Sequence, residues 1–392
     1  MSQCKGLSNE DCNKFDSCKY VNGSKRKYCR TKKNRKRVSK KPMSSFKKSI
    51  VSEPEYMAIL NYEFQDKPFA AFDLDDTIIK TKSGKKFPRD KEDWTFAYDH
   101  TKETLQKLHP KYNIIIITNQ KRLKKYELRD DFVEKIDAIV KALEIPINVY
   151  ISTSEGYYRK PFTGLWKQFI KSQSKKSFYC GDAAGREGDF SATDWMFAYN
   201  LKLKFMKPEN IFLKDKQKIT YELPDYLEKY KGTTETITLE QSENVMVLMC
   251  GYPGSGKSTI AKSLNFKIAS NDLFGTQSKV KKYVKECIQS NQNIVIDNVN
   301  HTKKNREEFT KIAKKYGYSV TIIHIDNDIN FCYYMNQLRT ELSQGSKKLV
   351  PKIAYYTIKK RFEVPQKSEC DQLIRLSNKV KKYEYVFPGL FN

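Results

Sequence analysis

Short apolar runs that end in polar residues recur along the first half of the chain and predict buried strands. They lie at 69–74, 113–118, 147–152 and 177–182. A short apolar run bounded by turn residues is typical of a strand that is buried on both faces. Helical patterns separate these runs near 102–108 and 131–143. Because strands and helices alternate, we expect a parallel sheet with right-handed crossover connections.

The same alternation begins again in the second half of the chain. Residues 216–242 are polar and charged without a core pattern, and we interpret them as an interdomain linker. Further apolar runs follow at 244–250, 293–296 and 319–325, with helical patterns near 330–341 and 351–363. The sequence therefore predicts two α/β domains, one at 61–215 and one at 243–392.

Residues 1–60 follow a different pattern. A Cys-rich module is expected at 1–30, and it contains Cys4, Cys12, Cys18 and Cys29. Four cysteines can hold one Zn²⁺ tetrahedrally, but none of the gaps has the tight C-x-x-C spacing. A disulfide pair and metal-free thiols therefore stay open as alternatives. We interpret residues 31–60 as a basic linker. It could contact phosphates or serve as a nuclear address, and the alternative is that it only keeps the chain in solution.

The chain is strongly basic, which points to a polyanionic partner. Its formal net charge is +27 and its pI is about 9.5, and such an excess favours nucleic acid over a membrane surface. No apolar run is long enough to span a membrane, and the N-terminus has no apolar signal segment. We therefore expect an intracellular protein. In a reducing compartment the scattered cysteines should be free and mostly buried: Cys180, Cys250, Cys287, Cys332 and Cys370.

Polar side chains follow three of the strands predicted in the first domain. Asp73 and Asp75 end the first strand, and the period of two places them on the same side of an extended segment. Thr118 follows the second strand and Asp182 the fourth. Ligands of open α/β sheets bind beyond the carboxyl ends of parallel strands, so these groups should meet there. The simpler alternative is that the aspartates only cap turns or the next elements.

Lys160 completes a set of groups that phosphate-ester hydrolysis through a covalent intermediate requires. Asp73 would attack phosphorus and form an aspartyl-phosphate. Asp75 would protonate the leaving oxygen and then activate water. Thr118 and Lys160 would hold the phosphoryl oxygens. Mg²⁺, bound by Asp73, by Asp182 and by the backbone carbonyl of Asp75, would offset the charge that keeps a carboxylate away from a phosphate.

This set of residues resembles that of the haloacid dehalogenase phosphatases. The resemblance rests on four signatures that occur in order at predicted strand ends. The segment from Thr77 to the next strand is short and leaves no room for a separate cap domain. An open site suits a large substrate, and with the positive charge it favours a nucleic-acid end over a small metabolite.

The second domain contains a phosphate-binding loop. Residues 251–259 fit the pattern GxxxxGK[ST], follow a predicted strand and precede an apolar helix start. The glycines let backbone N–H groups surround the phosphates of ATP, Lys257 reaches the β- and γ-oxygens, and Ser258 can bind Mg²⁺. The expected nucleotide-binding residues are Gly251, Gly254, Ser255, Gly256, Lys257, Ser258 and Thr259.

A kinase also needs a base beside the acceptor hydroxyl. Asp272, a helix's length after the loop, is the candidate, with a helix N-cap as the alternative. Asp297 ends the strand near 293–296, where an aspartate that orients the metal would lie. Arg339 is a candidate clamp for the transferring phosphate, with a surface ion pair as the alternative.

Taken together, these motifs resemble the polynucleotide kinase 3′-phosphatases, from about residue 65 to about residue 366. The matching segments include FDLDDT at 72–77, TKSGKKFP at 81–88, TNQ at 118–120, YRKP at 158–161, GDAAGR at 181–186, IDNVN at 296–300 and NQLR at 336–339. The order of the two domains is like that of the eukaryotic enzymes. The expected fold is therefore a haloacid-dehalogenase-like Rossmannoid phosphatase domain followed by a P-loop kinase domain.

The resemblance implies repair of broken DNA ends. The first site would remove a 3′-phosphate, and the second would transfer the γ-phosphate of ATP to a 5′-hydroxyl. The chain would then act with a DNA ligase and a repair polymerase, in the nucleus or in a viral replication and repair compartment, since its composition resembles that of large DNA viruses. The family usually has Gly where Asp76 stands, so we expect an active site with a slightly altered loop.

Two alternative functions stay open at this point. The same chemistry could act on RNA ends, because no reader of a 2′-hydroxyl is visible in the sequence. The chain could also be a non-enzymatic scaffold that binds DNA ends on a relic fold, or a scaffold with only the phosphatase active. Loss of Asp73, Asp75 or Lys257 would have favoured the scaffold, and all three residues are present.

Overall fold

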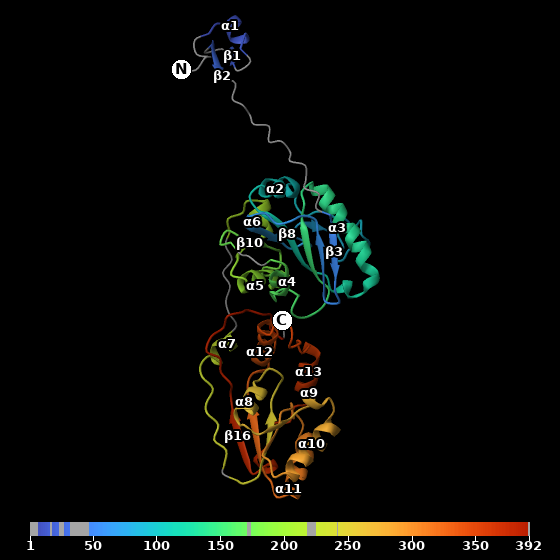
Figure 1. The fold of residues 1–392 in the computed structure, drawn as a ribbon, viewed down its shortest axis with the longest axis vertical. Helices are drawn as coiled ribbons and strands as arrows, with labels where there is room; N and C mark the ends of the chain where they lie inside the picture. The colour runs from blue at the N-terminus through green and yellow to red at the C-terminus, as the bar shows by residue number, and fades with distance from the viewer. Residues whose placement is uncertain are drawn as a thin grey trace. The chain divides into compact units, whose positions relative to one another are not determined.

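The computed structural model describes residues 7–15, 18–22, 27–31, 47–170, 174–217, 225–240 and 242–390. The chain divides into two compact units, Met1–Lys47 and Lys48–Asn392. The second unit contains two large sheets flanked by helices, coloured from blue to green and from yellow to red in Figure 1, and a two-stranded hairpin. No helix in the described residues is long and apolar enough to cross a bilayer.

The first unit is a small cystine-linked hairpin. Helix α1 (Asn9–Asn13) precedes β1 (Cys18–Asn22) and β2 (Lys27–Thr31), which pair antiparallel. A disulfide joins Cys12 to Cys29, and Cys18 is also disulfide-bonded. Of the three alternatives that the sequence left open, the structure has the disulfide, and sulfur atoms bonded to each other are not available as thiolate ligands of zinc. Cys4 lies outside the described residues.

The predicted parallel sheet of the first domain is confirmed, and it has seven strands in the order β11-β10-β5-β8-β9-β4-β3. The strands are β3 (Ser49–Ser52), β4 (Tyr56–Leu60), β5 (Phe69–Phe72), β8 (Asn113–Asn119), β9 (Asn148–Ser152), β10 (Phe178–Cys180) and β11 (Lys204–Met206). All neighbours pair parallel except β3 with β4 and β4 with β9. Strands β3 and β4 lie within the range that the sequence predicts as linker, so the sheet begins earlier than expected.

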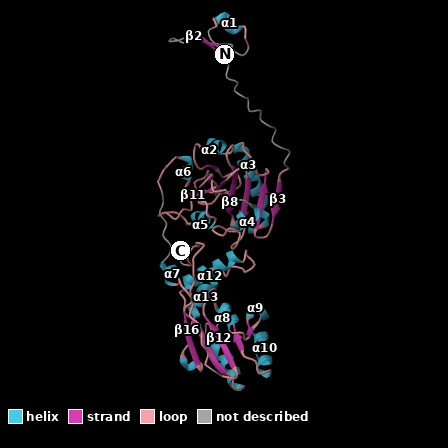
Figure 2. Ribbon diagram, turned by 60° about the vertical axis from the view of Figure 1, so that its left-hand side comes forward, coloured by secondary structure: helices cyan, strands magenta, loops and turns pink. Residues whose placement is uncertain are grey.

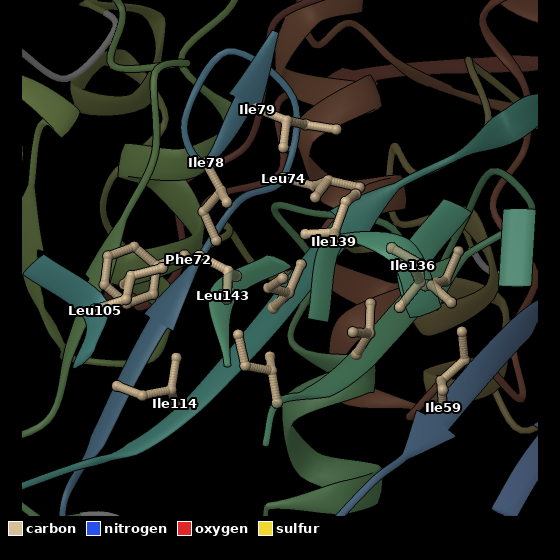
Figure 3. Close-up of a cluster of buried hydrophobic side chains, with 14 of the residues drawn as sticks. Ile59, Phe72, Leu74, Ile78, Ile79, Leu105, Ile114, Ile136, Ile139 and Leu143 are labelled. Carbon is tan, nitrogen blue, oxygen red and sulfur yellow. The ribbon is translucent and has the colours of Figure 1, made fainter. Parts of the chain in front are cut away.

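Helices cover both faces of this sheet. They are α2 (Thr101–Leu108), α3 (Arg129–Leu143), α4 (Gly164–Phe169), α5 (Thr193–Asn200) and α6 (Pro208–Phe212), with a hairpin of β6 (Ile79–Lys80) and β7 (Thr95–Phe96) and two short 3₁₀ turns at Lys121–Lys124 and Tyr126–Leu128. Phe72 and Ile114 point into a cluster with Leu105 of α2 and Ile136 of α3 (Figure 3). The alternate strand positions contact α4 and α5 on the other face. Burial on both faces explains the continuous apolar runs.

The second sheet is entirely parallel, in the order β13-β14-β12-β15-β16. Its strands are β12 (Val245–Cys250), β13 (Lys267–Ala269), β14 (Ile294–Ile296), β15 (Ser319–Ile325) and β16 (Gln372–Leu376). The helices of this half are α7 (Asp225–Lys229), α8 (Lys257–Ser263), α9 (Asn271–Phe274), α10 (Gln277–Gln289), α11 (Lys303–Lys315), α12 (Ile329–Leu342) and α13 (Lys352–Arg361), with a 3₁₀ turn at Lys367–Glu369.

Figure 2 shows both groups of strands among their helices. The helices expected near 330–341 and 351–363 are confirmed as α12 and α13. The free thiols are confirmed as well: Cys180, Cys250, Cys287 and Cys332 are buried and Cys370 is partly buried.

Candidate active sites

The first site forms where three parallel strands end at one edge of the sheet. Phe72, the last residue of β5, pairs with Cys180 of β10 on one side and with Ile116 of β8 on the other. The backbone N–H of Asp73 donates a hydrogen bond of 2.8 Å to the carbonyl of Cys180. Leu74 is fully buried in the core, so its two neighbouring aspartates point the other way, as the alternation predicts.

Lys160 is the centre of the hydrogen-bond network at this edge. Its Nζ donates to Oδ1 of Asp73 at 2.6 Å, to the hydroxyl of Tyr179 at 2.8 Å and to Oδ1 of Asp194 at 2.8 Å. An ammonium group has three donors, and all three are used here. The Lys160 side chain is only 3% exposed, so it is a buried cation fixed between two carboxylates and not a surface lysine.

Asp194 is a site residue that the sequence reasoning missed. It lies in the first turn of α5, a common place for an aspartate, so its type and position carried no signal. Its Oδ2 accepts a hydrogen bond of 3.1 Å from the N–H of Ala183. A Cβ atom at Gly181 would overlap the Asp194 carboxylate, so only glycine permits this approach. The Gly-Asp pair that follows β10 therefore makes room for a second carboxylate.

Three carboxylates offer a site for a divalent cation. Ligand oxygens of Asp73, Asp182 and Asp194 lie within 4.8 Å of one another. Burial, reinforced by the neighbouring carboxylates, raises the pKa of Asp73 well above its ordinary value, although Lys160 opposes the shift. Burial and then Asp194 raise the pKa of Asp182 to about 6. The single ammonium group of Lys160 does not balance the three carboxylates, so negative charge remains at the site. A hard cation such as Mg²⁺ would offset this charge, and carboxylate oxygens are its preferred ligands.

The side chain of Gln120 connects the other two predicted residues. Its Nε2 donates to Oδ2 of Asp75 at 2.6 Å and to Oγ1 of Thr118 at 3.0 Å. Asn119 holds the backbone of Lys160, because its Oδ1 accepts from the Lys160 N–H at 3.0 Å. The TNQ segment thus places the threonine, orients Asp75 and anchors the lysine. The five groups predicted to converge at the first site do lie together at this edge.

The second site is the loop between β12 and α8. Gly251, Gly254 and Gly256 all have positive φ, at 150°, 75° and 97°. A Cβ atom at Gly254 would overlap the carbonyl of Cys332, so this glycine is required by space as well as by conformation. Lys257 is buried, and its Nζ donates to the loop carbonyls of Gly251 at 2.9 Å and Tyr252 at 2.7 Å.

The remaining loop residues fit nucleotide binding. Burial lowers the pKa of Lys257, and the charge of Arg339 adds to this effect while Asp297 opposes it. Among the described residues, the Ser255 hydroxyl is buried without a hydrogen-bond partner, and Ser258 and Thr259 are exposed at the start of α8. The loop therefore presents polar groups for ligand oxygens, and the charges of Asp297 and Arg339 act on its lysine.

Two alternatives for the kinase residues are decided by the structure. The N-cap of α9 is Ser270, whose side chain accepts from the N–H of Leu273, so Asp272 is not a cap. Asp272 is exposed in the first turn of that helix. Arg339 donates to Oδ1 of Asn336 at 3.0 Å and to the carbonyl of Lys348 at 3.5 Å, and not to a carboxylate. Among the residues that the structure describes, Arg339 therefore forms no ion pair.

Comparisons with known proteins follow the same division of the chain. A family model described as polynucleotide kinase 3 phosphatase matches residues 68–212. A model described as chromatin associated protein KTI12 matches residues 269–372. The bifunctional polynucleotide phosphatase/kinase of Schizosaccharomyces pombe is 32% identical over 334 residues, which cover 81% of each protein. The chain belongs to the bifunctional polynucleotide phosphatase/kinase family.

Two further relatives resemble this chain over part of its length. A putative bifunctional polynucleotide phosphatase/kinase of Acanthamoeba polyphaga mimivirus is 30% identical and covers 76% of this chain and 82% of its own. The polynucleotide 3′-phosphatase ZDP of Arabidopsis thaliana is 35% identical over 167 residues, which cover 37% of this chain and 24% of its own.

Asp76 stands at the position where we expect a glycine from the sequence resemblance. The residue has a φ of 53°, which is the left-handed region that glycine adopts most easily. Aspartate is one of the few other residues that tolerate this conformation. The backbone at Asp76 therefore has a conformation that glycine would also adopt, and Asp73 and Asp75, which precede it in the chain, lie at the site.

An exposed group of aromatic and basic side chains is presented by two further loops of the phosphatase half. Phe87 is 64% exposed and Phe190 is 85% exposed. Nζ of Lys86 lies 4.8 Å from the ring centroid of Phe190 and 6.0 Å from that of Phe87. Asp93 fixes the first loop by accepting from Ser83 and Arg89 backbone N–H groups at 2.7 Å and 2.9 Å.

Proposed function

We propose that this chain heals broken nucleic-acid ends. One site hydrolyses a 3′-phosphate, and the other transfers the γ-phosphate of ATP to a 5′-hydroxyl. The observation that carries the proposal is the convergence of Asp73, Lys160 and Asp182 at one sheet edge, together with a separate phosphate-binding loop. Membership of a family whose relatives are named polynucleotide phosphatase/kinase supports both activities.

In the phosphatase reaction, Asp73 is the nucleophile. Its Oδ1 is held by Lys160, so the carboxylate is oriented before the substrate arrives. Lys160 and Thr118 bind the phosphoryl oxygens. Asp75, oriented by Gln120, gives a proton to the leaving 3′-oxygen and then takes one from the attacking water. Mg²⁺ held by Asp73, Asp182 and Asp194 would supply the charge that lets a carboxylate approach a phosphate.

In the kinase reaction, the loop residues bind ATP. Backbone N–H groups of the loop and Lys257 contact the phosphates, and Ser258 and Asp297 would hold Mg²⁺ that neutralises them. Asp272 takes the proton of the 5′-hydroxyl, for which an exposed carboxylate at a helix start is accessible. Arg339, whose charge acts on Lys257, stabilises the negative charge of the phosphoryl group during transfer.

The substrate we propose is DNA with a single-stranded or frayed 3′-end. Exposed aromatic rings beside lysines stack bases without reading sequence, and Phe87, Phe190 and Lys86 form such a group. The net charge of +27 favours binding to phosphates. The product, with a 3′-hydroxyl and a 5′-phosphate, is what a DNA ligase seals, so we propose action beside a ligase and a repair polymerase in a nuclear or viral repair compartment.

A nicked duplex with a 3′-phosphate and a 5′-hydroxyl tests the reaction directly. With Mg²⁺ alone, the 3′-phosphate should be released while the 5′-end stays unlabelled. With γ-labelled ATP, the 5′-end should also acquire the label. The same nick made in RNA tests the alternative substrate, and equal or faster turnover on RNA would contradict DNA as the preferred end. Binding without either reaction would favour a scaffold instead.

A further inference from the structure

A buried carboxylate of the kinase half bonds only to groups of the phosphatase half, among the residues that the structure describes. Glu341, in the last turns of α12, is 0% exposed. It accepts hydrogen bonds from the backbone N–H of Thr163 at 3.0 Å and from the Thr163 hydroxyl, and Nζ of Lys167 lies 2.7 Å from its Oε1. A buried carboxylate is costly unless it is fully paired. These contacts therefore fix Thr163 firmly to α12.

The segment that Glu341 holds begins at the phosphatase lysine. Thr163 follows Lys160 by three residues. Between them, Phe162 packs in one cluster with Phe331 and Tyr334 of α12. The carbonyl of Pro161 accepts a hydrogen bond of 3.0 Å from Asn200, whose side chain also bonds the backbone of Val386 near the C-terminus. Each residue that follows Lys160 in this segment is thus connected to the second half of the chain.

Helix α12 also contacts the nucleotide loop. The hydroxyl of Tyr355 donates to the carbonyl of Pro253 in the loop at 2.8 Å and to that of Cys332 in α12 at 3.3 Å. Gly254 approaches Cys332 so closely that no side chain fits between them. Helix α12 therefore lies against the phosphate-binding loop at Cys332, and its last turns hold the lysine segment through Glu341.

We propose that Glu341 is a positioning residue of the phosphatase site, a role that rests on the proposed function. By fixing Thr163, it sets the backbone that carries Lys160, so that the amine reaches Asp73 and Asp194. It touches neither the substrate nor the reacting atoms, and it acts through Lys160. A displacement of a catalytic group by about 1 Å can cost roughly 100-fold in rate, which sets the scale of the effect.

Glu341→Gln in the full chain tests this role. The variant keeps the shape but only one of the two oxygens that accept from Thr163, and it loses the charge that binds Lys167. We expect the 3′-phosphatase kcat to fall by about 10- to 100-fold, with KM for the DNA end and the 5′-kinase activity changed less than about twofold. Glu308→Gln is the matched control, because this carboxylate of α11 pairs with Lys281 and Gln277 within the kinase half. It should leave both activities unchanged.

A second pair of variants keeps the test decisive if Glu341→Gln does not fold. Thr163→Val removes the hydroxyl donor at nearly constant volume and should lower the phosphatase kcat in the same way. Thr163→Ser keeps the donor and should retain the wild-type rate. Combining Glu341→Gln with Thr163→Val should give less than the product of the two single effects, because both act on one interaction.

The contradicting results are distinct from a failure of the proposed function. An active wild type whose Glu341→Gln and Thr163→Val variants keep the phosphatase kcat within about twofold would overturn the positioning role alone. A parallel loss of kinase and phosphatase would also overturn it, because that pattern indicates general destabilisation. A wild type without 3′-phosphatase activity would overturn the proposed function, and the positioning role with it.

Discussion

At the scale of single residues, the phosphatase site depends on the ion pairs that one buried lysine forms with two carboxylates. Lys160 binds Asp73 and Asp194 together, and both carboxylates are largely shielded from water. Asp73, Asp75 and Asp182 were predictable because they follow strands, and Thr118 because it lies at the end of one. Asp194 was not, since an aspartate in the first turn of a helix is common for reasons unrelated to catalysis. Only the close approach at Gly181 distinguishes it.

Asp93 offers a test at this scale, because it organises the loop that presents Phe87. Asp93→Ala removes the acceptor for Ser83 and for the N–H of Arg89. A looser loop should stack the DNA end less well, so KM for a 3′-phosphorylated oligonucleotide should rise about fivefold or more, while kcat changes less than about twofold. Steady-state kinetics measure both constants.

Asp90→Ala is the control, since the Asp90 side chain lies in the same loop and accepts from the N–H of Glu92. An unchanged KM for Asp93→Ala would contradict the role of the loop.

The hydrogen bonds that Asp93 accepts, first that from Ser83, lower the pKa of its carboxyl group to about 2. Its ordinary value is about 3.9, so its stabilising contribution is present above about pH 4 and is lost as the pH falls toward 2. Urea unfolding should show the wild type and Asp93→Ala converging in stability over that range.

At the scale of elements, strands with continuous apolar runs were predictable and those with mixed patterns were not. The run before Asp73 and the run at 113–118 are buried on both faces, which gives an unbroken signal. Strand β3 is an edge strand with mostly exposed residues, and it follows a basic stretch. Its pairing with β4 comes from tertiary context, which propensity does not show.

The close approach of the nucleotide loop to α12 gives an element-scale prediction. Gly254→Ala should reduce kinase activity by about 100-fold or more, because its Cβ would overlap the carbonyl of Cys332 and displace the loop. Gly317→Ala has the same kind of backbone, with φ of 72°, but no atom within 4 Å of the new Cβ. It should cost only the strain of about 1–2 kcal/mol and keep its kinase rate. Equal kinase losses in the two variants would show that strain, not space, matters at Gly254.

At the scale of the whole molecule, the presence of two α/β folds in one chain was predictable, and the start of the first sheet at β3 was not. The basic composition and the two motif sets indicate two phosphoryl-transfer sites in one chain. The sequence left zinc, a disulfide and free thiols open for the N-terminal cysteines, and the structure has the disulfide between Cys12 and Cys29. The halves of the second unit share a core cluster, which includes Phe162 and Phe387, and no motif signals such a shared core.

Removing the first unit tests the role of its charge. Deletion of residues 1–47 ends before β3, so the seven-stranded sheet stays complete. DNA affinity should fall, and the dependence of log K on log salt should become less steep, by about 0.9 for each DNA phosphate that the first unit neutralises. Binding titrations at several salt concentrations give this slope. If the full chain and the truncated chain gave the same slope, residues 1–47 would make no contribution to binding DNA phosphates.

The most direct measurement of the central claim compares three proteins on one nicked duplex that carries a 3′-phosphate and a 5′-hydroxyl. With Mg²⁺ and labelled ATP, the wild type should release the phosphate and label the 5′-end. Asp73→Asn should label without releasing phosphate, and Lys257→Ala should release phosphate without labelling. If either substitution abolished both reactions, or neither reaction, the assignment of Asp73 and Lys257 to two separate phosphoryl-transfer sites would be contradicted.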